Sequence, residues 1–221
     1  MADRNRILAE ARTLLGAGRE AEADRLLVPL LEADPGDAEA MGLLAEARMA
    51  LTPENPMAHI LMATSEQRAG RPRRAIAHAR SALRLDPDNA AALTLLGFCQ
   101  RDAGAPDKAV EPLTRAAAQL PGSADAQLAL ANVLRDAERP QDAVAAYRAG
   151  LAHDADSVAI HSNLAVTLQQ LGELAEAREH FEAAIAKAPE QAAIHYNLAI
   201  LDLLRGRFAD GFARYDWRWR K

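Results

Sequence analysis

The sequence repeats itself with a period of 34 residues. Five consecutive segments, with no gap between them, open at Pro56, Ala90, Ala124, Val158 and Ala192. A fixed period of this length is typical of a stack of identical helical units, each of which buries its apolar face against its neighbours. Such a stack has no single globular core and leaves a long surface free, which favours binding over catalysis.

Each repeat places the same kinds of residue at the same positions, counted from the residue that opens it. A large apolar residue and a tiny one stand at positions 7 and 8, as in Leu96-Gly97 and Leu164-Ala165. This pairing allows a second helix to approach closely. Position 15 is glycine in four repeats and Glu138 in the other, which predicts a left-handed residue closing the first helix. Three prolines at position 17 predict the start of the second helix: Pro72, Pro106 and Pro140.

With Leu113, Tyr147, Phe181 and Tyr215 at position 24, and proline recurring at position 32, this pattern resembles the tetratricopeptide repeat. The resemblance covers about residues 4–221 and implies an all-α fold, an α-solenoid in which helix-turn-helix repeats form a right-handed superhelix. We expect a single domain over residues 1–221. Its full repeats lie at about residues 4–37, 56–89, 90–123, 124–157, 158–191 and 192–221.

Residues 38–55 depart from this pattern. They hold one amphipathic segment, at about Ala38 to Leu51, followed by a proline-containing turn. Because a full repeat needs two helices, we expect an irregular half-repeat there.

Charge and composition exclude several classes of function. A net charge of −5 argues against nucleic acid as a partner. No stretch is long and apolar enough to span a membrane, and the charged segment Met1 to Arg12 does not resemble a secretory signal, so we expect a cytoplasmic protein. The sequence has no glycine-rich phosphate loop and no HExxH, CxxC or GxSxG motif. We therefore predict no catalytic residue, no cofactor and no metal, and interpret the single cysteine, Cys99, as a packing residue.

Five histidines recur in register. His59, His161 and His195 share position 4, and His78 and His180 share position 23. Rings at the same position of adjacent repeats are separated by about one repeat spacing, which is too far for a shared metal. We expect these histidines to be half-buried and structural.

The resemblance also implies that first helices line the concave face of the superhelix. The predicted groove is an apolar strip with polar side chains along it, and its residues are Ile60, Thr64, Gln67, Thr94, Phe98, Arg101, Leu128, Asn132, Arg135, Ser162, Asn163, Val166, Tyr196, Asn197 and Ile200. None of the positions in this groove carries a lysine. We therefore predict against the chaperone carboxylate tails that some members of the family bind.

Two of these residues, Asn163 and Asn197, share position 6 in adjacent repeats. In tetratricopeptide domains attached to protein glycosyltransferases, stacked asparagines at this position hold a peptide backbone. An amide suits that role because it both donates and accepts hydrogen bonds. Ordinary surface asparagines are an alternative interpretation that the sequence leaves open.

The segment from Phe208 to Lys221 holds five of the nine aromatic residues of the chain. A solenoid needs a polar cap at its end, yet this segment ends on aromatic rings. Either the rings fold onto the preceding helices, or the segment docks against a downstream domain or a second copy through Phe212, Tyr215, Trp217 and Trp219. The segment resembles the last repeat of bacterial proteins that join tetratricopeptide repeats to a glycosyltransferase.

Three functions follow from these observations. The first is a protein-interaction scaffold that binds a peptide or protein partner in the concave groove. The second is the substrate-recruiting or oligomerisation region of a larger glycosyltransferase-type enzyme, inert in itself. The third is a self-assembling scaffold in which the aromatic end of one copy packs on the start of another.

Overall fold

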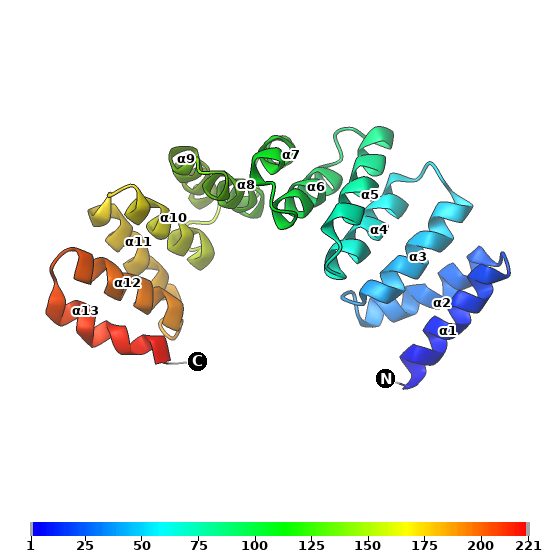
Figure 1. The fold of residues 1–221 in the computed structure, drawn as a ribbon, viewed down its shortest axis with the longest axis horizontal. Helices are drawn as coiled ribbons and strands as arrows, with labels where there is room; N and C mark the ends of the chain where they lie inside the picture. The colour runs from blue at the N-terminus through cyan, green and yellow to red at the C-terminus, as the bar shows by residue number, and fades with distance from the viewer. Residues whose placement is uncertain (1, 220–221) are drawn as a thin grey trace. The chain divides into compact units, whose positions relative to one another are not determined.

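The computed structural model describes residues 2–219, and over that range every regular element is a helix (Figure 1). The helices fall into two compact units, Met1–Gln119 (unit 1) and Leu120–Lys221 (unit 2). Within each unit, successive helices pack against one another in the order of the chain. The predicted all-α class and its helix-turn-helix repeats are confirmed, whereas the single domain over residues 1–221 stays a prediction.

Unit 1 consists of α1 (Ala2–Gly16), α2 (Glu20–Ala33), α3 (Ala38–Leu51), α4 (Pro56–Arg68), α5 (Pro72–Leu85), α6 (Ala90–Asp102) and α7 (Pro106–Gln119). Unit 2 consists of α8 (Ala124–Asp136), α9 (Pro140–Leu151), α10 (Val158–Gln170), α11 (Leu174–Lys187), α12 (Ala192–Leu204), α13 (Phe208–Tyr215) and a short 3-10 helix, η1 (Asp216–Trp219). In the five repeats of 34 residues, the first helix begins at the residue that opens the repeat, and these residues are Pro56, Ala90, Ala124, Val158 and Ala192.

Left-handed residues end the first helices, as predicted. Gly70, Gly104, Gly172 and Gly206 have φ between 71° and 84°, and Glu138 takes the same conformation with φ of 57°. A residue with a side chain is strained in this region, whereas glycine is not. The turn therefore forms in every repeat even where glycine is missing.

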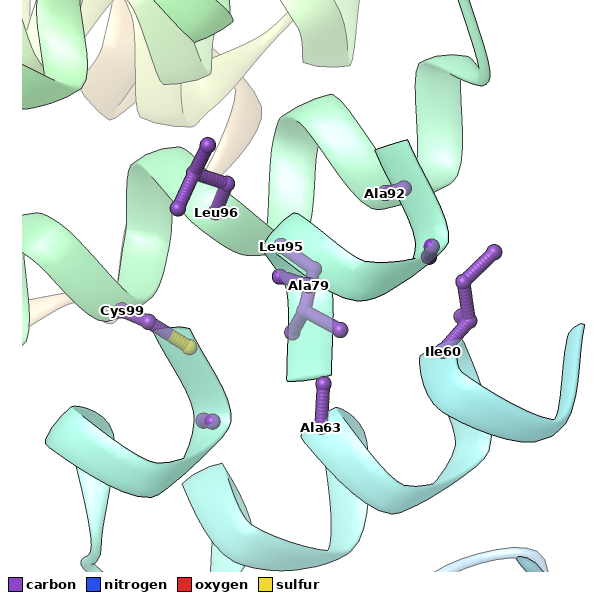
Figure 2. Packing of buried hydrophobic residues seen from close by; sticks show 9 residues of the cluster. Ile60, Ala63, Ala79, Ala92, Leu95, Leu96 and Cys99 are labelled. Atoms are coloured by element: carbon purple, nitrogen blue, oxygen red, sulfur yellow. The ribbon is translucent and has the colours of Figure 1, made fainter. Parts of the chain in front are cut away.

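Small residues allow the two helices of a repeat to come close together. A Cβ atom added to Gly97 of α6 would lie 2.4 Å from Cγ of Leu113 on α7, so only glycine fits there. The space between α4, α5 and α6 is filled mainly by alanines, together with Leu95, Leu96 and Cys99 (Figure 2). Stability in such a stack comes from these interfaces, because isolated helices of this length are marginal.

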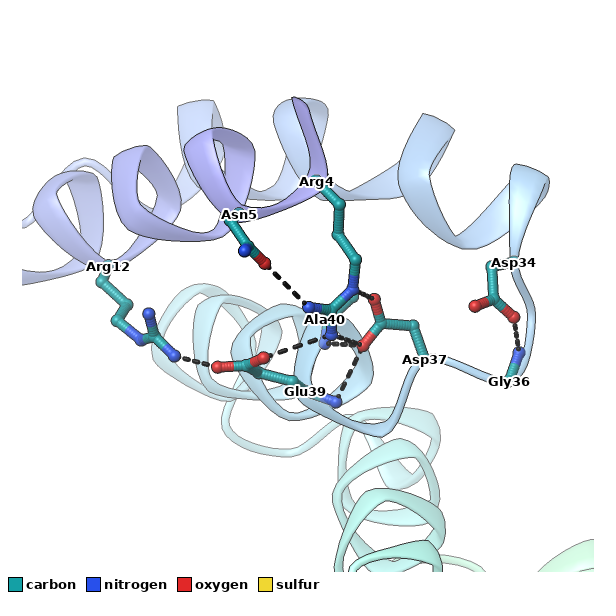
Figure 3. Close-up of polar contacts among 8 residues, drawn as sticks. All are labelled: Arg4, Asn5, Arg12, Asp34, Gly36, Asp37, Glu39 and Ala40. Carbon is teal, nitrogen blue, oxygen red and sulfur yellow. Dashed lines mark hydrogen bonds and ion pairs between the residues drawn. The ribbon is translucent and has the colours of Figure 1, made fainter. Parts of the chain in front are cut away.

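The half-repeat predicted at residues 38–55 consists of α3 alone, whose bounds match the prediction. Asp37 caps this helix by accepting hydrogen bonds from the backbone N–H groups of Glu39 and Ala40, each at 3.1 Å. The same carboxylate accepts from Nε of Arg4 on α1 at 2.6 Å (Figure 3). The guanidinium of Arg4, hydrogen-bonded to this carboxylate, holds the pKa of Asp37 below its usual range. An ion pair thus ties α1 to the unpaired helix.

A cavity of about 420 Å³ lies between α3 and α4. Two polar side chains of its lining have partners within the fold: Oγ of Ser65 donates to the carbonyl of Ala38 at 2.6 Å, and Glu66 is paired with Arg71. The cavity lies beside the single helix of the half-repeat, and Glu46 of α3, which also lines it, is exposed.

Candidate peptide-binding surface

In unit 1, the predicted groove residues on α4 and α6 lie on helices that contact each other. Five of these six residues are half-buried, and they are Thr64, Gln67, Thr94, Phe98 and Arg101. Nε2 of Gln67 donates to the carboxylate of Asp102 at 3.1 Å. The guanidinium of Arg101 lies over the ring of Phe98, 5.5 Å from its centroid. The structure therefore brings these side chains into one half-exposed surface.

The exception is Ile60, for which the groove prediction is wrong. Its side chain is 8% exposed and belongs to the core cluster between α4, α5 and α6. Most other members of that cluster are alanines, so the larger isoleucine side chain fills space between the helices. Thr94, at the same position of the next repeat, stays half-buried.

In unit 2, α10 contacts both α8 and α12, so three first helices form one surface. The predicted residues on these helices are all half-buried, and they are Leu128, Asn132, Arg135, Ser162, Asn163, Val166, Tyr196, Asn197 and Ile200. Half-burial is the state in which a side chain is held in place and yet reachable by a ligand. This surface combines aliphatic side chains with amides.

A hydrogen-bond network fixes two of the amides. The hydroxyl of Tyr147, on α9, donates to Oδ1 of Asn132 at 2.7 Å, and Nδ2 of Asn163 donates to the same oxygen at 3.0 Å. The Tyr147 side chain is fully buried, and burial raises its pKa. The phenol therefore stays a donor at neutral pH, and this sets the orientation of both amides. Nδ2 of Asn132 and Oδ1 of Asn163 form no hydrogen bond within residues 2–219.

This pairing differs from the one that the sequence suggested. Asn163 is joined to Asn132 of the preceding repeat, and no hydrogen bond within the described residues joins it to Asn197. The sequence signal that could have identified the pair of Asn132 and Asn163 is Tyr147, at position 24. The second helix of a repeat runs antiparallel to the first. Position 24 then lies beside position 9, where Asn132 stands.

The histidines pack inside repeats rather than between them. The rings of His59 and His78 are stacked with centroids 5.8 Å apart, and those of His161 and His180 are 5.1 Å apart. Nε2 of His161 contacts the carbonyl oxygen of Ala155 at 3.0 Å. The two ring pairs are structural contacts between the helices of one repeat, and the contact with Ala155 joins His161 to the turn that precedes α10. Over residues 2–219, no group of three or more His, Cys, Asp or Glu side chains is arranged to hold a metal.

The aromatic residues near the carboxyl end divide into two sets. Trp217 stacks on His195 of α12 with centroids 3.9 Å apart, and Tyr215 lies against Tyr196 at 5.6 Å. Phe212 and Trp219, by contrast, are exposed. Tyr215 and Trp217 thus fold back onto the preceding helix, α12, whereas Phe212 and Trp219 lie at the surface.

Two further observations concern reactivity and membranes. Cys99 is buried, and burial raises the pKa of its thiol to about 11. It is therefore protonated at neutral pH and acts in packing. Among the helices described, none combines the length and the apolar character needed to cross a membrane.

Comparison with known families identifies the repeat. A family model described as tetratricopeptide repeat matches residues 60–124, 128–192 and 163–216, which together make up more than half of the chain. No curated protein matches the sequence.

Solved structures resemble the fold. MamA is 21% identical with a TM-score of 0.66, over 71% of this chain and 91% of that chain. YrrB, described as a TPR protein with an unusual peptide-binding site, is 20% identical with a TM-score of 0.67, over 78% of this chain and 89% of that chain. PilF of Pseudomonas aeruginosa is 19% identical with a TM-score of 0.62, over 96% of this chain and 88% of that chain. At these identities the likeness shows the fold alone.

Proposed function

Because the chain belongs to the tetratricopeptide repeat family, whose members are protein-interaction scaffolds, we propose that it binds an extended polypeptide segment on the first helices of unit 2. The binding surface consists of the half-buried side chains of α8, α10 and α12. The chain acts as a non-enzymatic scaffold in this proposal, and its ligand is a protein or peptide.

The observation that carries the proposal is the pair of oriented amides. The network around Tyr147 leaves one donor, Nδ2 of Asn132, and one acceptor, Oδ1 of Asn163, on the same surface. A peptide group offers the complementary pair, a carbonyl oxygen and an N–H. Recognition of the main chain at this place is independent of the side chains of the ligand.

The apolar neighbours supply the other part of the affinity. Leu128 on α8 and Val166 on α10 are half-buried on the same helices as the two amides. Burial of apolar ligand side chains there contributes roughly 25 cal/mol per Å². Affinity then comes from apolar anchors, and the amides set the register of the ligand. The description of YrrB as a TPR protein with a peptide-binding site supports the same class of ligand.

A displayed library of random 12-residue peptides, selected on the full chain, supplies a ligand for the test. We expect Asn163→Ala to weaken binding of the selected peptides by about tenfold or more, a loss of about 1.4 kcal/mol. Gln141→Ala is the matched control, since Gln141 is exposed on the second helix α9. Circular dichroism checks that helicity is kept. Unchanged affinity in Asn163→Ala would contradict the proposal.

The transferase-linked alternative stays a prediction. Reading the open reading frame beyond Lys221 tests it directly, because a glycosyltransferase domain encoded there would place this chain in a larger enzyme.

A further inference from the structure

The outward face of α5 carries an arginine stripe, defined here as Arg73, Arg80 and Arg84 with Ala77 between the first two. These four residues are exposed and follow one another at intervals of four, three and four residues, so the helical period places them on one side of the helix. Arg74 flanks the stripe and is also exposed. The opposite side of α5 is buried in the core cluster (Figure 2), and its residues are Ala75, Ala79 and Ala82.

The charges of these arginines are not neutralised by the neighbouring chain. Within the part of the chain that the structure describes, neither the arginines of the stripe nor Arg74 form an ion pair with a carboxylate. Residues 52–89 contain four acids. Three of them have other partners, and these are Glu66, Asp86 and Asp88. The fourth, Glu54, is exposed in the turn before α4 and is not paired with the stripe.

The other second helices do not share this charge pattern. α2, α7, α9, α11 and α13 each have an acidic residue in the first turn, whereas α5 has none and carries Arg73 and Arg74 there. At the repeat positions of the stripe, α9 has one arginine, Arg148, which is paired with Glu176. The same positions carry acids in α7 and α11, and these are Asp107, Glu111, Glu179 and Glu182. A row of arginines is therefore not needed to form the repeat.

The stripe is unfavourable for the chain on its own. Arg80 and Arg84 are like charges four residues apart on one helix, which repel each other. Arg73 and Arg74 lie at the positive end of the helix dipole, where acidic residues are favourable and basic residues are not. An anionic partner relieves both effects, because its negative charges face the row of arginines and the positive end of the helix.

The size of the stripe favours one kind of anionic partner. Arg73 and Arg84 are eleven residues apart, so the stripe is about 16 Å long. A nucleic acid would extend beyond it over a chain whose net charge is −5. An anionic membrane would need bulky apolar side chains beside the arginines, and among the residues of α5 Leu85 alone is such an exposed side chain. An acidic α-helix matches the stripe in length and in the spacing of its side chains.

We propose that the arginine stripe of α5 binds an acidic α-helix of a partner protein, whose carboxylates form one row at intervals of four, three and four residues. Ala77, which has no side chain beyond Cβ, allows the partner helix to approach closely. Attraction between the two rows of charge sets the register of the partner and weakens as salt rises. The stripe lies in unit 1 and its binding does not depend on the amide pair of unit 2.

Two synthetic alanine-rich helical peptides test the proposal by fluorescence anisotropy with the full chain. Both contain four glutamates and have the same composition. In the row peptide the glutamates follow one another at intervals of four, three and four residues, and in the scattered peptide they are distributed around the helix. We expect the row peptide to bind about tenfold or more tightly than the scattered peptide. Its affinity is expected to fall as NaCl rises from about 0.05 M to about 0.5 M.

The stripe variant Arg80→Gln/Arg84→Gln is expected to lose about tenfold or more in affinity for the row peptide. Arg25→Gln/Lys108→Gln is the matched control and keeps the affinity, because it removes the same charge from exposed residues of the second helices α2 and α7. Circular dichroism checks that both variants keep their helicity.

Equal affinity of the two peptides, unchanged affinity in the stripe variant, or an equal loss in the control variant would each overturn the proposal. Tighter binding of a poly(U) oligonucleotide or of phosphatidylserine vesicles than of the row peptide would also overturn it, as would a wild-type dimer in sedimentation that the stripe variant loses. Each of these last results assigns the stripe to a different occupant.

Discussion

At the scale of single residues, the turn between the two helices of a repeat forms even where its left-handed glycine is replaced by another residue. Glu138 stands where the other repeats have glycine, and it keeps the left-handed conformation with φ of 57°. A left-handed residue with a side chain costs roughly 1–2 kcal/mol. The turn is retained because the helices on either side of it are held by their packing.

Relief of this strain gives a prediction. We expect Glu138→Gly to stabilise the protein by about 0.5–1 kcal/mol, since the lower strain outweighs the greater flexibility of glycine in the unfolded chain. Urea unfolding followed by circular dichroism measures the change. The reverse substitution, Gly104→Glu, at φ of 77°, is the control and is expected to destabilise. A Glu138→Gly variant no more stable than wild type would contradict this account.

At the scale of helices, the repeat pattern did not predict which side chains contact each other between the two antiparallel helices of a repeat. The period predicted where helices begin and end, and it placed His161 and His180 at recurring positions. The period did not predict that these two histidines contact each other. It compares equal positions in adjacent repeats, whereas His161 and His180 stand at positions 4 and 23 of the same repeat. Those two positions meet only when the second helix folds back, and the ring orientations depend on local packing. The pair Asn132 and Tyr147 was missed for the same reason.

The contact between His161 and His180 predicts a pH dependence. Their Nδ1 atoms are 2.9 Å apart, so one hydrogen fits between them and a second does not. The pKa of His180 is lowered, first by burial and then by His161 and Arg148, against the opposing effect of Glu176. A lowered folded pKa means that the unfolded chain binds more protons. Stability is therefore fully present above about pH 6.5, the unfolded value, and is lost as pH falls through the folded pKa.

We expect His180→Gln to show a smaller loss of stability between pH 7.5 and pH 5 than wild type, measured by urea midpoints. His59, whose pKa is also lowered, contributes in the same direction and remains in the variant. His153→Gln is the control, because His153 is exposed. Equal pH slopes in wild type and His180→Gln would exclude the pair as a source of the dependence.

At the scale of the whole molecule, the fold was predictable and the binding surface only in outline. The 34-residue period predicted the helix pairs and the left-handed turns, and the segment that departs from this period predicted the single helix between Ala38 and Leu51. The groove prediction failed at Ile60 because the same repeat position packs in the core in one repeat and at the surface in another. Position alone does not reveal which neighbours leave space for a large side chain.

The central claim is that the amides of Asn132 and Asn163 bind a polypeptide main chain. Titrating the full chain with a library-selected peptide, and following the side-chain amide signals by NMR, tests it most directly. We predict large shifts for the Nδ2 signals of Asn132 and Asn163 and none for Gln141. Shifts confined to the second helices α9 and α11, with both asparagines unchanged, would contradict the claim.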